Sequence, residues 1–162
     1  MAPLPIVNIA FDGAETGDML RLIDSRLVPM RPKVVAYYAG SNDIDAGEPA
    51  KAIVGRIRQF IERLTAALPD SHIIFMSINR APEKQDRWDV VDAVNHEIEM
   101  YAAKHPQLEY IDVNPVLFNR DGTPRLELFL SDRLHFRPQA YEEFVPLLKP
   151  ALTKALAARS VR

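Results

Sequence analysis

Asp132 and His135 stand three residues apart, between a long loop and the last helix that the sequence predicts. On a tight turn, a carboxylate at this spacing can accept the imidazole Nδ1–H and fix the tautomer of the ring. The other ring nitrogen, Nε2, is then free to act as a general base. The same spacing is also compatible with an Asp that caps the helix and a His that lies on the surface.

A second polar group, Gly40-Ser41-Asn42-Asp43, follows the most apolar predicted strand. The side-chain amide of Asn42 is a donor that can stabilise charge developing on a ligand oxygen. Gly, Asn and Asp are also the usual residues of a strand-ending turn, in which Asn42 and Asp43 would cap the next helix. Taken alone, this segment leaves both interpretations open.

The third polar group is Asp12-Gly13, at the end of the first predicted strand. The backbone N–H of Gly13 can serve as a second donor to an oxyanion, at a position where a side chain would crowd a substrate. The alternative is an ordinary strand-to-helix turn in which Thr16 is the helix N-cap.

Short apolar runs and longer amphipathic stretches alternate along the chain, and the carboxyl ends of the apolar runs carry these polar groups. Four runs rich in Val, Ile, Tyr and Phe predict strands, over Pro5–Ala10, Lys33–Tyr38, His72–Ser77 and Leu108–Val113. The stretches between and after them predict helices over roughly Thr16–Val28, Pro49–Leu68, Asp86–Lys104 and Pro138–Ala157. Strands separated by long helices indicate an α/β fold with parallel βαβ units. We therefore expect a three-layer α/β/α domain whose site lies at the carboxyl ends of a doubly wound parallel sheet.

Composition limits the classes of protein and of site. The chain has 162 residues, of which 48% are apolar and 26% charged, so we expect one soluble globular domain over residues 1–162. The net charge of −2 argues against nucleic acid as the main partner. The absence of cysteine excludes disulfides, thiolate metal sites and a cysteine nucleophile.

The remaining histidines give no sign of a metal centre. His72, His96 and His105 lack a convincing ligand spacing, so we expect no metal. No apolar run approaches the length of about 20 residues that a membrane span needs. We expect a soluble protein, cytoplasmic as the sequence stands, although a targeting signal ahead of Met1 would change the compartment.

The three polar groups resemble, in order and spacing, the later sequence blocks of the SGNH (GDSL-type) hydrolases. Asn8–Leu20 resembles the block whose glycine follows an asparagine by five residues, which places that glycine at Gly13. Gly40–Asp43 matches the Gly-x-Asn-Asp block, and Asp132–His135 matches the Asp-x-x-His block. The runs HIIFMSINRAP and YIDVNPVLFNRDG also read like this family.

This resemblance implies a cofactor-free ester hydrolase that works by acyl transfer through a serine nucleophile. In that mechanism His135 would deprotonate the serine and later protonate the leaving alcohol, and Asp132 would orient the imidazole. The Gly13 N–H and the Asn42 amide would form the oxyanion hole. Gly40 and Asp43 would support the loop that carries the amide.

The first block of the family, a strand ending in Gly-Asp-Ser, has no counterpart in this sequence. None of its serines follows a strand in that context; they are Ser25, Ser41, Ser71, Ser77, Ser131 and Ser160. We therefore expect a fold without its first strand, no nucleophile in this chain, and at most weak activity. The resemblance implies a flavodoxin-like sheet in which that strand lies between the second and the third. Without it two sheet edges lack partners, so we expect a homo-oligomer that forms through the exposed edge.

Three hypotheses for the function remain open at this point. The first is a serine esterase or acylhydrolase acting on small acyl esters. The second is a catalytically impaired domain that keeps the oxyanion pocket and binds a carboxylate, an acetyl group or a sugar. The third is an interaction domain that self-associates through its open sheet edge. None of the three hypotheses involves nucleic acid or a membrane span.

Overall fold

A computed structural model describes residues 5–157, and a parallel β-sheet lies at the centre of the fold. Its strands are β1 (Val34–Tyr37), β2 (His72–Met76) and β3 (Leu108–Ile111), in the spatial order β1-β2-β3. Val34 lies opposite His72, and Ile73 lies opposite Leu108. Each connection crosses over through a long helix, as parallel pairing requires.

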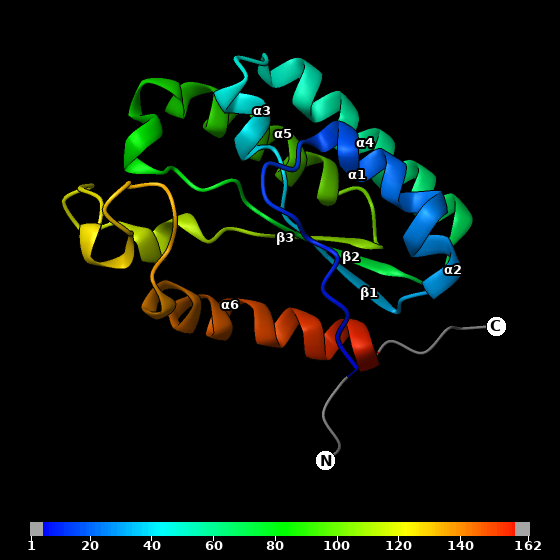
Figure 1. The fold of residues 1–162 in the computed structure, drawn as a ribbon. Coiled ribbons are helices and arrows are strands. Elements are labelled where there is room, and N and C mark those ends of the chain that lie inside the picture. The colour runs from blue at the N-terminus through cyan, green and yellow to red at the C-terminus, as the bar shows by residue number, and fades with distance from the viewer. Residues whose placement is uncertain (1–4, 158–162) are drawn as a thin grey trace.

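Helices cover both faces of this sheet, so the fold has the predicted α/β/α layers (Figure 1). On one face lie α1, α4 and α5, and on the other lies α6. The α-helices are α1 (Thr16–Leu22), α2 (Val28–Met30), α3 (Ser41–Asp45), α4 (Ala50–Ala67), α5 (Trp88–Ala102) and α6 (Pro138–Ala157). A π-helical turn, Ile23–Leu27, joins α1 to α2, and short 3₁₀ helices span Pro82–Arg87, Asn114–Leu117 and Leu126–Leu128.

The apolar stripe predicted on the second helix faces the core. Its buried residues on α4 are Ile53, Ile57, Phe60, Ile61 and Leu64. They pack with α1, α5 and one face of the sheet in a single cluster. A second cluster fills the space between the sheet and α6, and contains residues of the long loop after β3. These two clusters fix the sheet between its helical layers and so hold the loops at its carboxyl edge.

The predicted strand Pro5–Ala10 is wrong, because this segment has no ladder partner among the described residues. It forms neither a helix nor a strand, and Ile6 and Val7 remain 85% and 63% exposed. Ile9 is the residue of this segment that packs against the core. A strand composition is not sufficient for a strand, since backbone N–H and C=O groups need a neighbour to pair with. The sheet therefore has three strands in the described part of the chain rather than the expected four.

The other predicted elements are confirmed, with ends shifted by a few residues. Within residues 5–157, no helix is long and apolar enough to cross a bilayer.

Candidate active site

Loops that follow the three strands meet at one edge of the sheet, because the strands are parallel. After β1 comes the oxyanion segment, defined as Gly40–Asp43. After β2 come Ser77–Ala81 and the 3₁₀ helix Pro82–Arg87. The long loop after β3 leads to the Asp–His turn, defined as Asp132–His135.

The start of the oxyanion segment depends on a glycine. Gly40 has φ +119°, a conformation that L-residues rarely adopt. A Cβ atom at this position would lie 2.5 Å from Cδ1 of Ile78, so the backbone passes directly over that side chain. This close approach turns the chain into α3 and sets where Asn42 lies.

Asn42 and Gly13, the two predicted oxyanion donors, are brought close together. Nδ2 of Asn42 donates to the carbonyl oxygen of Ala14 at 2.9 Å. Ala14 follows Gly13, which has φ +74°. The second hydrogen on Nδ2 and the Gly13 N–H make no hydrogen bond to another described residue. Two donors are therefore available on this side of the edge.

Asp43 is a structural bridge rather than part of an open cleft. Its side chain is 0% exposed, and its carboxylate accepts hydrogen bonds from the backbone N–H and the hydroxyl of Thr16. Arg56 of α4 donates to the same carboxylate at 2.9 Å. A buried carboxylate needs this compensation. These hydrogen bonds tie the start of α1 to α3, and so fix the position of Gly13 relative to Asn42.

The Asp–His turn has the geometry expected of an acid–base pair. Oδ2 of Asp132 lies 2.8 Å from Nδ1 of His135, and its Oδ1 accepts the backbone N–H groups of Leu134 and His135. The Leu134 N–H, followed by the His135 side chain and N–H, lowers the pKa of the Asp132 carboxyl to about 2. The His135 side chain is 70% exposed. With Nδ1 held by a carboxylate, Nε2 is the nitrogen left for proton transfer.

The two halves of the candidate site are joined indirectly. Within residues 5–157, no hydrogen bond links His135 to Asn42 or to Gly13. The contacts run through the 3₁₀ helix Pro82–Arg87 instead, where the N–H of Glu83 donates to the Arg133 carbonyl oxygen at 3.2 Å.

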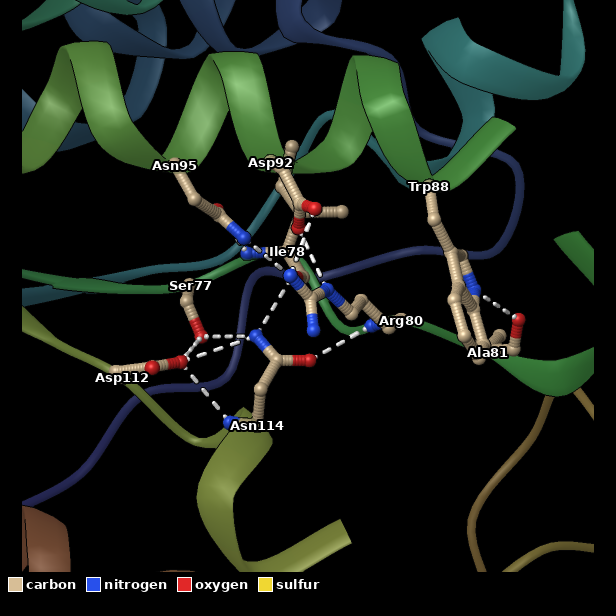
Figure 2. Close-up of polar contacts among 9 residues, drawn as sticks. All are labelled: Ser77, Ile78, Arg80, Ala81, Trp88, Asp92, Asn95, Asp112 and Asn114. Carbon is tan, nitrogen blue, oxygen red and sulfur yellow. Dashed lines mark hydrogen bonds and ion pairs between the residues drawn. The ribbon is translucent and has the colours of Figure 1, made fainter. Parts of the chain in front are cut away.

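A polar network behind this edge was missed by the sequence analysis. Figure 2 shows Asn95 of α5 bracketing the backbone of Ile78, with bonds of 2.8 Å to its N–H and to its carbonyl oxygen. The Asn114 amide donates to Ser77, Ile78 and Asp112 and accepts the N–H of Arg80. The available signal was a polar Asn95 within the buried stripe of α5. This network fixes the loop that carries Ile78 under Gly40.

Most of the described serines are engaged in structural hydrogen bonds. The hydroxyls of Ser25, Ser71 and Ser77 donate to Arg21 O, Pro32 O and Asp112, respectively. The Ser41 hydroxyl accepts a bond from Lys84. Ser131 is exposed next to Asp132, and Ser160 lies outside the described residues. In the described part of the chain, none of them is hydrogen-bonded to His135.

One cavity of the structure lies away from the Asp–His turn, and the described residues form no metal-binding group. Residues 5–157 contain no group of three His, Asp or Glu side chains placed to hold a metal ion. A cavity of about 390 Å³, lined in part by His72, His105 and Lys154, lies at the opposite end of the sheet, around the amino ends of β2 and β3. It is therefore separate from the Asp–His turn.

Known structures share this fold. A putative acylhydrolase from Bacteroides fragilis superposes with a TM-score of 0.76 at 18% identity, covering 89% of this chain and 72% of the other. A GDSL-like lipase from Bacteroides thetaiotaomicron gives a TM-score of 0.74 at 20% identity, covering 88% and 73%.

Sequence comparison identifies the family. The platelet-activating factor acetylhydrolase IB subunit alpha2 of Gallus gallus is 27% identical over 158 residues, which cover 96% of this chain and 67% of that protein. The chain thus spans about two thirds of the length of this relative. The sequence pattern of the GDSL-like lipase/acylhydrolase family matches residues 2–143. This chain therefore belongs to the GDSL-like lipase/acylhydrolase family.

Proposed function

We propose that this protein is a serine-type ester hydrolase in which Asp132 and His135 are the acid–base pair. The observation that carries the proposal is the 2.8 Å contact between the Asp132 carboxylate and Nδ1 of His135. A carboxylate in this position stabilises the imidazolium that forms when Nε2 takes a proton from the nucleophile. The same imidazolium then protonates the leaving alcohol.

The oxyanion of the tetrahedral intermediate would bind at Asn42 and Gly13. The free hydrogen of the Asn42 amide and the Gly13 N–H support this assignment, because both are donors without another described partner. The Asn42–Ala14 bond and the Asp43 bridge hold both donors before the substrate arrives. Donors fixed in this way need no reorganisation when negative charge develops.

The nucleophile in this proposal is a serine on a strand that pairs with the free edge of β1. β1 has a ladder partner on one side, which is β2. The segment Pro5–Ala10 is likewise without a ladder partner among the described residues. One parallel strand added at this edge would satisfy the open hydrogen bonds of β1. Its carboxyl end would reach the edge of the sheet that carries Asn42 and His135.

The substrate class we propose is a small acyl ester. One relative of this chain is named an acetylhydrolase, which by its name removes an acetyl group. The exposed His135 ring is accessible to a substrate that approaches from solvent.

We also propose that, as long as no serine-bearing strand pairs with β1, the 162-residue chain self-associates through this open edge. Ala36 is exposed on this strand, and an unpaired edge is a template for another strand. Light scattering at increasing concentration should show a dimer or a larger species, which Ala36→Lys should shift toward monomer because edge charges oppose pairing. Monomer at every concentration in the unmodified chain would contradict this part of the proposal.

Hydrolysis of a short-chain activated ester tests the catalytic proposal in the chain as it stands. We expect slow hydrolysis, because loss of a triad serine typically costs about a millionfold in turnover. The residual rate should fall with His135→Ala and with Asn42→Ala, and should not change with His96→Ala, a matched histidine on the exposed side of α5. Rapid turnover combined with labelling of Ser41 or Ser131 by a serine-directed phosphonate would show that the nucleophile is within this chain.

A further inference from the structure

Lys84 is a buried lysine that the proposed mechanism does not use. It lies in the 3₁₀ helix Pro82–Arg87 after β2, and its side chain is 3% exposed. Lysine is almost never buried to this degree unless its ammonium group is paired. The contacts of its ammonium group therefore indicate what the residue does.

All three ammonium hydrogens of Lys84 have acceptors on α3. Nζ lies 2.9 Å from the carbonyl oxygen of Ser41, 2.6 Å from its hydroxyl oxygen and 2.7 Å from Oδ2 of Asp45. Three donors matched by three acceptors fully satisfy an ammonium group. The two acceptor residues flank Asn42, so the lysine holds the chain on both sides of the proposed oxyanion donor.

The short contact between Ser41 and Lys84 also raises the possibility of a serine–lysine nucleophile pair. In such a pair the lysine must be neutral and must accept the hydroxyl proton. Nζ of Lys84 instead donates to the carboxylate of Asp45 at 2.7 Å and to the carbonyl oxygen of Ser41 at 2.9 Å. The Ser41 hydroxyl is then an acceptor toward Lys84, which opposes its activation as a nucleophile.

The helix that carries Lys84 is also attached to the Asp–His turn. The N–H of the adjacent residue, Glu83, donates to the carbonyl oxygen of Arg133 at 3.2 Å. Arg133 lies between Asp132 and His135 and has φ +58°, so its carbonyl direction is set by an unusual backbone conformation. Two neighbouring residues of one short helix thus contact the two halves of the candidate site.

We propose that Lys84 is a positioning residue that fixes the oxyanion segment relative to the Asp–His turn. It would act through Ser41 and Asp45 and would not touch the substrate. The inference rests on the ester hydrolase function proposed above. Its physical basis is that a displacement of about 1 Å between catalytic groups can lower a rate by about 100-fold.

The test compares Lys84→Met with Lys51→Met, a matched substitution of an exposed lysine on α4. Methionine keeps the length and packing of the side chain and removes all three donors. We expect the His135-dependent hydrolysis of a short-chain activated ester to fall by about 100-fold in kcat, with KM changed by less than about twofold. Lys51→Met should match the unmodified chain.

Amide hydrogen exchange gives a second readout that does not depend on activity. The N–H groups of Ile44 and Ala46 bond to Gly40 and Asn42, so their exchange reports the order of α3. We expect Lys84→Met to accelerate this exchange by about tenfold or more, while the amides of β2 stay protected. If no hydrolysis depends on His135, the proposed function fails and the exchange result still decides the role of Lys84.

Two results would overturn the inference. The first is that Lys84→Met behaves like Lys51→Met in both the exchange and the hydrolysis measurements. The second is that Ser41→Ala abolishes hydrolysis together with phosphonate labelling, which would make Ser41 the nucleophile and Lys84 its base. If Lys84→Met does not fold, Ser41→Ala serves as a milder variant, because it removes one of the three acceptors of Lys84. Unchanged hydrogen exchange at the Ile44 amide in Ser41→Ala would then count against the positioning role of Lys84.

Discussion

Gly40→Ala is a sharp perturbation of the candidate site, because the position combines a positive φ with a close packing contact. At φ +119°, a residue with a Cβ is strained by about 1–3 kcal/mol. The added methyl group would also lie 2.5 Å from Cδ1 of Ile78 and 3.4 Å from Cγ2 of Ile53. Both isoleucines are buried, so neither can move into solvent.

The expected loss of stability follows from these two effects. Forcing a methyl group into a packed core typically costs about 1–3 kcal/mol. Alanine restricts the unfolded chain more than glycine does, which offsets up to about 1 kcal/mol. We therefore expect Gly40→Ala to lower the free energy of unfolding by about 1–6 kcal/mol. With a urea m-value of about 2 kcal/mol/M, a loss of about 3 kcal/mol, near the middle of this range, lowers the midpoint of unfolding by about 1.5 M.

Urea unfolding followed by far-UV circular dichroism measures this loss, and Gly55→Ala is the matched control. Gly55 lies inside α4, and a Cβ there would meet no atom within 4 Å. Alanine is favoured over glycine in a helix by about 1 kcal/mol, so this control should be stabilising. Adding Ile78→Val to Gly40→Ala should recover part of the loss, since it removes Cδ1. The predicted clash with Ile78 would be refuted if Gly40→Ala were as stable as the unmodified chain. It would also be refuted if Ile78→Val recovered none of the stability lost in Gly40→Ala.

Three further outcomes are expected. Asp43→Asn should lower the free energy of unfolding by about 3 kcal/mol, because it breaks a buried ion pair, and urea unfolding would show this; a loss below about 1 kcal/mol would mean that the bridge is dispensable. Arg133→Gly should raise the free energy of unfolding and Arg133→Val should lower it, each by about 1 kcal/mol, because this exposed residue has φ +58°. Equal free energies of unfolding in the two variants would show that the backbone at Arg133 is not strained. The Asp132 pKa is lowered to about 2, chiefly by the Leu134 N–H and then by His135, so the carboxylate stabilises the turn at neutral pH and this contribution is lost as the pH falls toward 2. Carboxyl ¹³C NMR should show a higher Asp132 pKa in His135→Ala that stays below the ordinary value, and an unchanged pKa would contradict the contact.

The sequence was sufficient to predict the elements whose formation depends on local patterns. The stripe from Ile53 to Leu64 has helical spacing, and the structure buries it along α4. The Asp132–His135 contact was one of the two outcomes that the local sequence left open, because residues three apart on a turn can bring a carboxylate to an imidazole.

Contacts between distant segments were not predictable in the same way. Pro5–Ala10 has the composition of a strand, yet pairing depends on a neighbour that composition does not specify. Lys84 lies 43 residues from Ser41, and nothing in its local sequence indicates burial. Asn95 gave a partial signal, as a polar residue in an apolar stripe, but its partner Ile78 was visible only in three dimensions. The contacts of Lys84 and Asn95 depend on how distant segments pack, so they can be read only from the tertiary structure.

The central claim is that Asp132–His135 and the donors at Gly13 and Asn42 form an ester hydrolase site that takes its serine from a strand at the β1 edge. Its most direct test is the rate of hydrolysis of a short-chain activated ester by a chain extended ahead of Met1 with a strand that ends in Gly-Asp-Ser. The account predicts a rate higher than that of the 162-residue chain by orders of magnitude. This gain should be lost when the added serine is replaced by alanine, and also in His135→Ala. The claim would be contradicted by an extended chain that folds with the added strand paired to β1 and hydrolyses the ester no faster than the 162-residue chain. Robust turnover by the 162-residue chain itself would also contradict it.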